Sequence, residues 1–165
     1  MKATHLLCRA LGIALVAALA FSAALWVHRE DVLSAALAGV GSAVGQVQFA
    51  GRVLKQDPSA AGQRQAAYVI AQAAGQILEA APVVSQEGYS GDDVTGFGTQ
   101  LMSFEGQLQA GQEPRQLVKR QAKMLIALPE TVSPANRTGN FLVVGNGLLR
   151  KLPAIMRMFT KAGVR

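Results

Sequence analysis

The most apolar part of the chain lies near its N-terminus. Residues 10–27, ALGIALVAALAFSAALWV, are uncharged, and Ser22 and Trp26 are their only hydrogen-bonding side chains. A helix of this length spans about 27 Å, which is close to the thickness of the hydrocarbon core of a bilayer. A helix in a soluble core keeps a polar face, and this segment has none. The pattern therefore predicts that residues 1–27 enter or cross a membrane.

Two predictions are open for the end of this segment. Small residues fit a secretory signal peptide that is cleaved after Ala20 or Ala24. The apolar run continues to Val27, however, and Trp26 followed by a basic stretch is typical of a helix end at a membrane interface, which favours a retained signal-anchor. Bases outnumber acids before the segment and not after it, so we expect a cytoplasmic N-terminus and an exported body. The predicted location is the membrane, with a single pass, or the periplasm or exterior if the segment is removed.

From residue 32 to residue 54 the apolar positions recur at alternating steps of four and three. This spacing predicts a long helix with one heptad-like seam. Gly41 and Gly45 add a GxxxG pair, which permits two helix backbones to approach closely. The seam consists of Leu33, Leu37, Val40, Val44, Val47 and Leu54, with Gly51 at the remaining place. We expect the helix-packing residues Leu33, Leu37, Val40, Gly41, Val44 and Gly45 to contact another helix of the chain, a partner helix, or a second copy in a homo-oligomer.

The same region supports a rival interpretation as a second membrane pass. Residues 33–51 carry no charge, and residues 28–31 would then form a short hairpin between two passes. Gln46, Gln48 and four glycines make these residues poor candidates for insertion. A helix outside the hydrocarbon core is therefore the favoured prediction.

The rest of the chain shows helical patterns separated by breaks. Asp57 and Pro58 predict a helix start, and Pro82 predicts the end of that helix. Four glycines and no helical period predict a glycine-rich loop at 85–98. The helices are expected at 58–80, 99–110, 114–128, 141–152 and 153–161, although residues 141–144 also fit a short strand. The predicted fold class is all-α, with the membrane helix followed by a small helical body at 28–165.

Charge is distributed unevenly around the net value of +6. Residues 31–113 have a net charge of −5, whereas the basic C-terminal half, residues 114–165, holds ten bases against Glu130 alone. This half favours an anionic partner. The candidate residues for binding an anionic surface are Arg150, Lys151, Arg157, Lys161 and Arg165, which come from an amphipathic C-terminal segment that Pro153 is expected to divide.

Membrane lipids are the partner that this amphipathic segment favours. A C-terminal helix that packs on the body and leaves its bases in solvent is equally consistent with the pattern. Nucleic acid is less favoured, because Phe159 is the only aromatic residue there that could stack on bases.

The chain lacks the residues of the common catalytic and metal sites. Cys8 is the only cysteine, which excludes a thiolate metal cluster, and His28 is the only histidine of the body, which leaves nucleophile–base pairs almost no residues to draw on. Phosphate-, zinc- and dinucleotide-binding motifs are absent from the sequence. The acids Glu87, Asp92 and Asp93 lack the ordered ligand series of a calcium loop. We therefore predict no catalytic residue, no cofactor and no metal.

Together these patterns predict a membrane-anchored or exported small helical protein that acts by binding or scaffolding and is not an enzyme. The alternative is a two-pass membrane protein that oligomerises and perturbs or permeabilises the bilayer. An enzyme ranks third, because only carboxylates could supply its chemistry.

Overall fold

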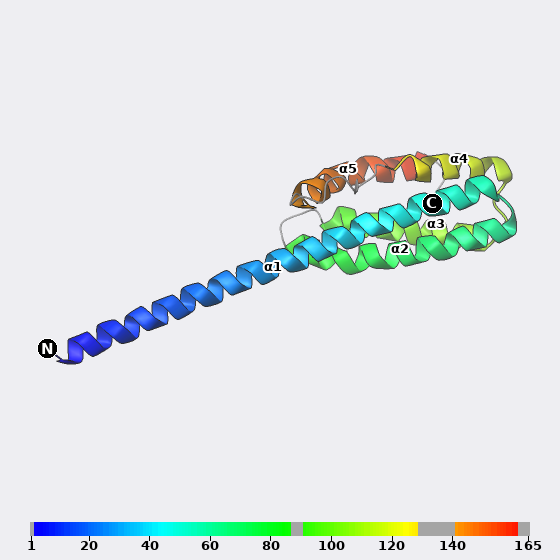
Figure 1. Ribbon diagram of the computed structural model, residues 1–165. Coiled ribbons are helices and arrows are strands. Elements are labelled where there is room, and N and C mark those ends of the chain that lie inside the picture. The colour runs from blue at the N-terminus through cyan, green and yellow to red at the C-terminus, as the bar shows by residue number, and fades with distance from the viewer. Residues whose placement is uncertain (1, 87–90, 129–140, 162–165) are drawn as a thin grey trace. The chain divides into compact units, whose positions relative to one another are not determined.

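The computed structural model of the chain contains five helices and, in the part that it describes, no strand (Figure 1). It describes the backbone of residues 2–86, 91–128 and 141–161, and the side chains of residues 15–29, 31–85, 91–128 and 151–161. The helices are α1 (Lys2–Gln56), α2 (Ala60–Gln86), α3 (Gly91–Gln109), α4 (Arg115–Ile126) and α5 (Phe141–Lys161). The all-α prediction is confirmed, and the alternative of a strand at 141–144 is wrong.

The chain divides into two compact units, Met1–Leu33 and Ser34–Arg165. Within the first unit the only element is α1, which is helical through residues 28–31. The hairpin that the two-pass interpretation requires at these residues is therefore wrong. The sequence shows why, since residues 28–31 contain neither glycine nor proline to interrupt the helix.

In the second unit, α1 contributes the heptad seam to the core. Leu37 is 6% exposed, and Val40, Val44, Val47 and Leu54 are at most 1% exposed. Close packing continues at Gly51, where an added Cβ would lie 2.8 Å from Leu125 Cβ and 3.1 Å from the carbonyl oxygen of Ala122. Both of these atoms belong to α4. Only glycine at position 51 permits this close approach of α1 and α4 without a shift of one of them.

The turn between α1 and α2 differs in detail from the predicted helix start. Ser59, rather than Asp57, occupies the capping position of α2, and its Oγ accepts a hydrogen bond from the Gly62 N–H at 3.4 Å. Asp57 acts one step earlier, because its Oδ1 accepts the Ser59 N–H at 3.0 Å. The side chains of Asp57 and Ser59 thus each accept one backbone N–H at the start of α2.

The helix α2 continues to Gln86, so the prediction that Pro82 ends it is wrong. Pro82 lacks the N–H that would bond to the carbonyl of Leu78, but it is exposed, while Ala80, Ala81 and Val84 are buried. Packing on either side of the proline outweighs the one missing hydrogen bond.

The predicted loop at 85–98 is also wrong for the residues that the structure describes. Residues 91–98 form the first two turns of α3, and residues 87–90 lie outside the described part of the chain. Asp92 and Asp93 occupy the first turn, where negative charge stabilises a helix. The glycines allow α2 and α3 to pack closely, since an added Cβ at Gly98 would lie 2.8 Å from Leu78 Cγ. Buried residues then recur at alternating steps of three and four, at Val94, Phe97, Leu101, Phe104 and Leu108.

The helix α5 packs on α3 through aromatic contacts. The ring of Phe159 meets Phe97 edge to face at a centroid distance of 5.7 Å, and it meets Phe104 in the same way at 6.2 Å. All three side chains are fully buried. The helix is continuous through Pro153, so the two separate helices predicted at 141–152 and 153–161 are one element.

Candidate functional site

The first unit carries an apolar surface. Every described side chain from residue 15 to residue 29 is exposed. Trp26 is 61% exposed, and the other large apolar residues of this stretch are exposed to a similar degree, namely Leu15, Val16, Leu19, Phe21, Leu25 and Val27. Exposed apolar side chains on all sides of a helix need an apolar surrounding. The segment is therefore the first candidate for an interaction site.

Within the described part of the chain, two helices are long and apolar enough to cross a membrane, by length and composition. They are Leu15–Gln56 within α1 and Ala60–Ser85 within α2. The two differ in how the protein uses their apolar residues. Ile70, Ala73, Ala74 and Ile77 of α2 are fully buried in the helical body, as expected of a core helix. Most exposed large apolar residues of α1 precede residue 28, and Val32 and Phe49 are the two that follow it among the described residues.

The predicted helix-packing residues lie on α1, mostly on its buried side. Leu33, Leu37, Val40 and Val44 are buried, and Gly41 is buried with them. Gly45 is exposed, and no heavy atom lies within 4 Å of the place where its Cβ would be. The GxxxG pair therefore does not act as one contact inside the chain. The close approach occurs instead at Gly51, which the sequence pattern marked only as a gap in the seam.

The predicted anionic-surface residues of α5 are separated from its apolar face. Lys151, Arg157 and Lys161 are exposed, and Arg157 Nε donates to the carbonyl oxygen of Pro153 at 3.2 Å. The side chain of Arg150 and the whole of Arg165 lie outside the described part of the chain. The apolar residues Leu152, Ile155 and Phe159 are buried in the body. Among the described side chains of α5, the exposed ones therefore include these bases and Met158, which is 41% exposed.

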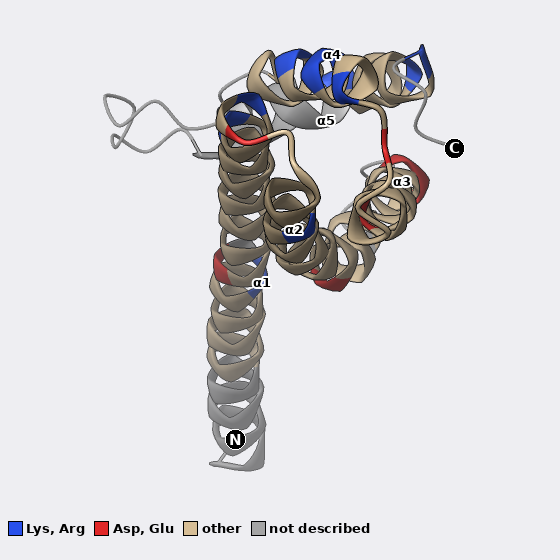
Figure 2. Cartoon of the chain, turned by 90° about the vertical axis from the view of Figure 1, so that its right-hand side faces the viewer, with Lys and Arg blue, Asp and Glu red and all other residues tan. Residues whose placement is uncertain are grey.

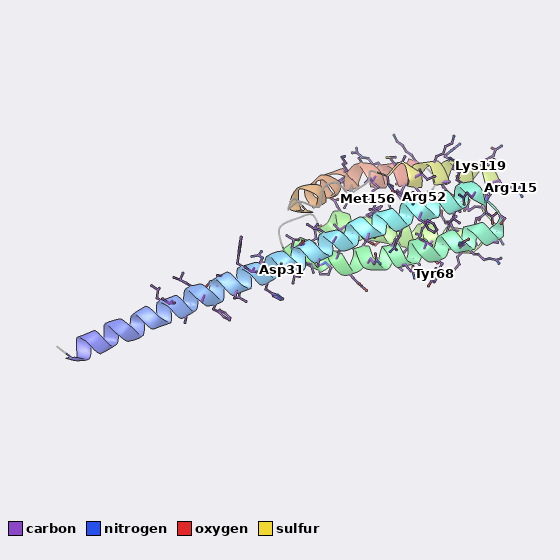
Figure 3. The ribbon with its side chains drawn as sticks, in the orientation of Figure 1. Asp31, Arg52, Tyr68, Arg115, Lys119 and Met156 are labelled. Atoms are coloured by element: carbon purple, nitrogen blue, oxygen red, sulfur yellow. The ribbon has the colours of Figure 1, made fainter. Side chains whose placement is uncertain are left out.

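A denser basic surface lies on α4. It belongs to the basic C-terminal half, residues 114–165, but it contains none of the five residues predicted to bind an anionic surface. Its residues are Arg115, Lys119, Arg120 and Lys123, here called the α4 basic face, and all four are exposed. Figure 2 shows basic segments along α4, and Figure 3 labels Arg115 and Lys119. The spacing of i, i+4, i+5 and i+8 places them on one side of the helix. On the other side of α4, Val118, Ala122 and Leu125 are fully buried. The spacing of the four bases along the helix predicted at 114–128 already indicates that they face outward.

The acids of the body lie on different elements from these bases. The helices α4 and α5 contain no Asp or Glu, whereas α3 contains Asp92, Asp93 and Glu105 and no Lys or Arg. Figure 2 shows this division, with basic segments along α4 and acidic segments on α3. The body is therefore strongly polarised in charge.

One carboxyl group lies near the basic end of the body. The pKa of Asp57 is lowered from its ordinary value, chiefly because its side chain bonds to Ser59, and the charge of Arg115 contributes as well. Lowering the pKa keeps Asp57 ionised in acid. This group therefore strengthens the α1–α2 turn and offsets only a small part of the nearby positive charge.

No group of three His, Cys, Asp or Glu side chains among the described residues is placed to hold a metal ion. Of the acids considered above as a calcium loop, Asp92 and Asp93 belong to the first turn of α3, and Glu87 lies outside the described residues.

No family model, no curated protein and no solved structure matches the chain.

Proposed function

We propose that the chain is a membrane-anchored helical protein that acts by binding or scaffolding. Residues 1–27 supply the anchor, and residues 28–165 supply a body on the exported side. The observation that carries this proposal is the exposure of all described side chains from residue 15 to residue 29 on an apolar helix. Placing the seven large apolar residues in lipid is favourable by roughly 10–20 kcal/mol, at about 1.5–3 kcal/mol for each fully transferred side chain.

The body is suited to present surfaces rather than to perform chemistry. Its apolar residues from all five helices are used in one core, and its charges are sorted into a basic side on α4 and α5 and an acidic α3. Such sorting supports binding to a charged partner. The two-pass alternative needs a hairpin at residues 28–31, where α1 is helical. Its second pass, residues 33–51, would also have to leave the core, because Leu37, Val40 and Val44 are buried.

Fractionation tests the anchor. We expect the full chain to remain with membranes after an alkaline carbonate wash. The double change Leu15→Arg and Leu19→Arg should release it, because a central arginine disfavours insertion by about 2.5–3.5 kcal/mol. Met102→Arg, on an exposed position of α3, is the matched control and should leave the chain in the membrane fraction. Release of the unchanged chain by the wash would refute the anchor.

Cysteine labelling separates one pass from two. In a Cys8→Ser background, Ala110→Cys places a single exposed thiol at the end of α3. One pass exposes this thiol to a membrane-impermeant maleimide in intact cells, whereas two passes protect it. The unchanged chain supplies the control, because its only thiol, Cys8, should be labelled only after the membrane is opened.

A further inference from the structure

The strongest charged surface of the described chain is the α4 basic face, Arg115, Lys119, Arg120 and Lys123. Eight residues of helix separate Arg115 from Lys123, which corresponds to about 12 Å along the helix axis. Four bases over this length form a denser array than Lys151, Arg157 and Lys161 on α5, which extend over ten residues of helix. Figure 3 labels two of these exposed side chains, Arg115 and Lys119.

The α4 basic face is held firmly by the body beneath it. Gly51 of α1 permits the close approach of Ala122 and Leu125, and Val118 and Leu125 are fully buried. At the start of α4, Gln63 of α2 bonds to the backbone of Glu113. The four bases therefore lie on a fixed helix rather than on a mobile tail, so binding costs little ordering entropy.

We propose that the α4 basic face docks on the anionic headgroups of a lipid surface. This inference rests on the proposed membrane anchor, which keeps the body close to lipid and raises the effective headgroup concentration. Lysine and arginine near an anionic bilayer each favour association, and the attraction decays within one Debye length. An array of bases on one side of a helix that itself contains no acid suits a surface of repeated phosphate groups.

The chemistry of α4 favours lipid over nucleic acid as the partner. The helix contains no aromatic residue, and the exposed Phe49 of α1 lies 6.0 Å from the Arg52 guanidinium, in a cation–π contact. Binding of single-stranded nucleic acid usually combines bases with aromatic side chains that stack on nucleobases. An array of charge alone is sufficient for headgroups.

The test measures how close α4 comes to headgroups in the full chain. In a Cys8→Ser background, Gln116→Cys carries a fluorophore on the exposed side of α4. The labelled chain is reconstituted in nanodiscs that contain a headgroup-nitroxide lipid, which quenches the fluorophore on contact. The discs contain either neutral phosphatidylcholine alone or a mixture with anionic phosphatidylglycerol. A second chain, labelled at Met102→Cys on α3, reports on a part of the body that lacks bases.

We expect strong quenching at position 116 in anionic discs, little in neutral discs, and loss of the difference at high salt. The label at position 102 should not respond to lipid charge. The triple change of Lys119, Arg120 and Lys123 to glutamine should weaken docking on the order of 100-fold. The matched triple change of Lys151, Arg157 and Lys161 to glutamine removes the same charge from α5 and should retain most of the quenching.

Each contrary result is decisive. Equal quenching in neutral and anionic discs, or equal loss in the two triple variants, would overturn the assignment to the α4 basic face. The label at position 116 could also respond to an added single-stranded oligonucleotide and not to anionic lipid. That result would overturn the proposal and assign the α4 basic face to nucleic acid. A chain that remains outside the discs would refute the anchor instead, and the same label read against added anionic vesicles would still decide whether α4 docks.

Discussion

Gln63 holds the backbone of Glu113 by both of that residue's polar groups. Gln63 Nε2 donates to the Glu113 carbonyl oxygen at 3.1 Å, and Gln63 Oε1 accepts from the Glu113 N–H at 3.2 Å. Gln63 is only 2% exposed and lies in the first turn of α2, fifty residues before its partner. This pair fixes the chain between α3 and α4, and so it sets the position at which the α4 basic face begins.

Gln63→Ala should therefore lower the free energy of unfolding by about 1–3 kcal/mol, because it removes the partner of two part-buried backbone groups of Glu113. The exposed neighbour Gln65 provides the matched control, and Gln65→Ala should change stability by less than about 0.5 kcal/mol. Urea denaturation of the two variants measures both values. Equal stability would mean that the Gln63–Glu113 bonds contribute nothing.

Two glycines of α1 should respond in opposite directions to alanine. Gly51→Ala places a methyl group 2.8 Å from Leu125 Cβ and should destabilise the body by roughly 1–3 kcal/mol, because both helices must shift. Gly45→Ala meets no atom within 4 Å and should stabilise it by about 0.5–1 kcal/mol through helix propensity. Thermal unfolding monitored by circular dichroism checks the pair. A loss of stability at Gly45, with a change in oligomeric state, would instead reveal a contact between copies.

Two buried glutamines form a second opposed pair. Gln121 on α4 is fully buried, and neither of its side-chain polar atoms has a hydrogen-bond partner in the described structure. Gln121→Leu should therefore stabilise the body by about 1–3 kcal/mol. Gln48 is 9% exposed and donates to the Leu128 carbonyl at 2.8 Å, so Gln48→Leu should destabilise it by a similar amount. Stability changes of the same sign at both positions would contradict the hydrogen bonding described above.

The stability of the body should decline in acid partly through Asp57. Its pKa is lowered in the folded state from the ordinary value of 3.8, first by the Ser59 side chain. A lowered carboxyl pKa contributes stability above the unfolded value, and that contribution is lost as the pH falls through the folded value. The free energy of unfolding should thus fall less steeply below about pH 4 in Asp57→Asn, and also in Ser59→Ala, than in the unchanged protein. Identical pH slopes in all three proteins would exclude this role of Asp57.

Much of the fold follows from spacing in the sequence. The alternation of three and four between residues 33 and 54 marks the buried side of α1, because a heptad repeat keeps one face of a helix toward its neighbour. The turn at Asp57 and Pro58 and the helix at 114–128 are likewise visible from local chemistry. These features depend on residues close together in the chain.

The errors concern residues whose conformation depends on distant contacts. Glycines at 91–98 predict a loop when read locally, but Gly98 is a packing residue that admits Leu78 of α2. Pro82 predicts a helix end, but buried neighbours on both sides keep α2 continuous. The amphipathic pattern of α5 likewise leaves open what covers its apolar side, and the structure shows Phe159 packed against Phe97 and Phe104. Tertiary packing overrides local propensity at each of these sites.

The fluorescence of Trp26 tests the central claim most directly, because it is the only tryptophan in the chain and lies at the end of the apolar segment. The unchanged full chain is reconstituted in lipid vesicles, and its emission is recorded with brominated lipids in the bilayer or with iodide in the water. If residues 1–27 form the anchor, the emission is blue-shifted, brominated lipids quench it, and iodide quenches it weakly. Emission typical of water, with strong quenching by iodide and none by brominated lipids, would contradict the membrane anchor.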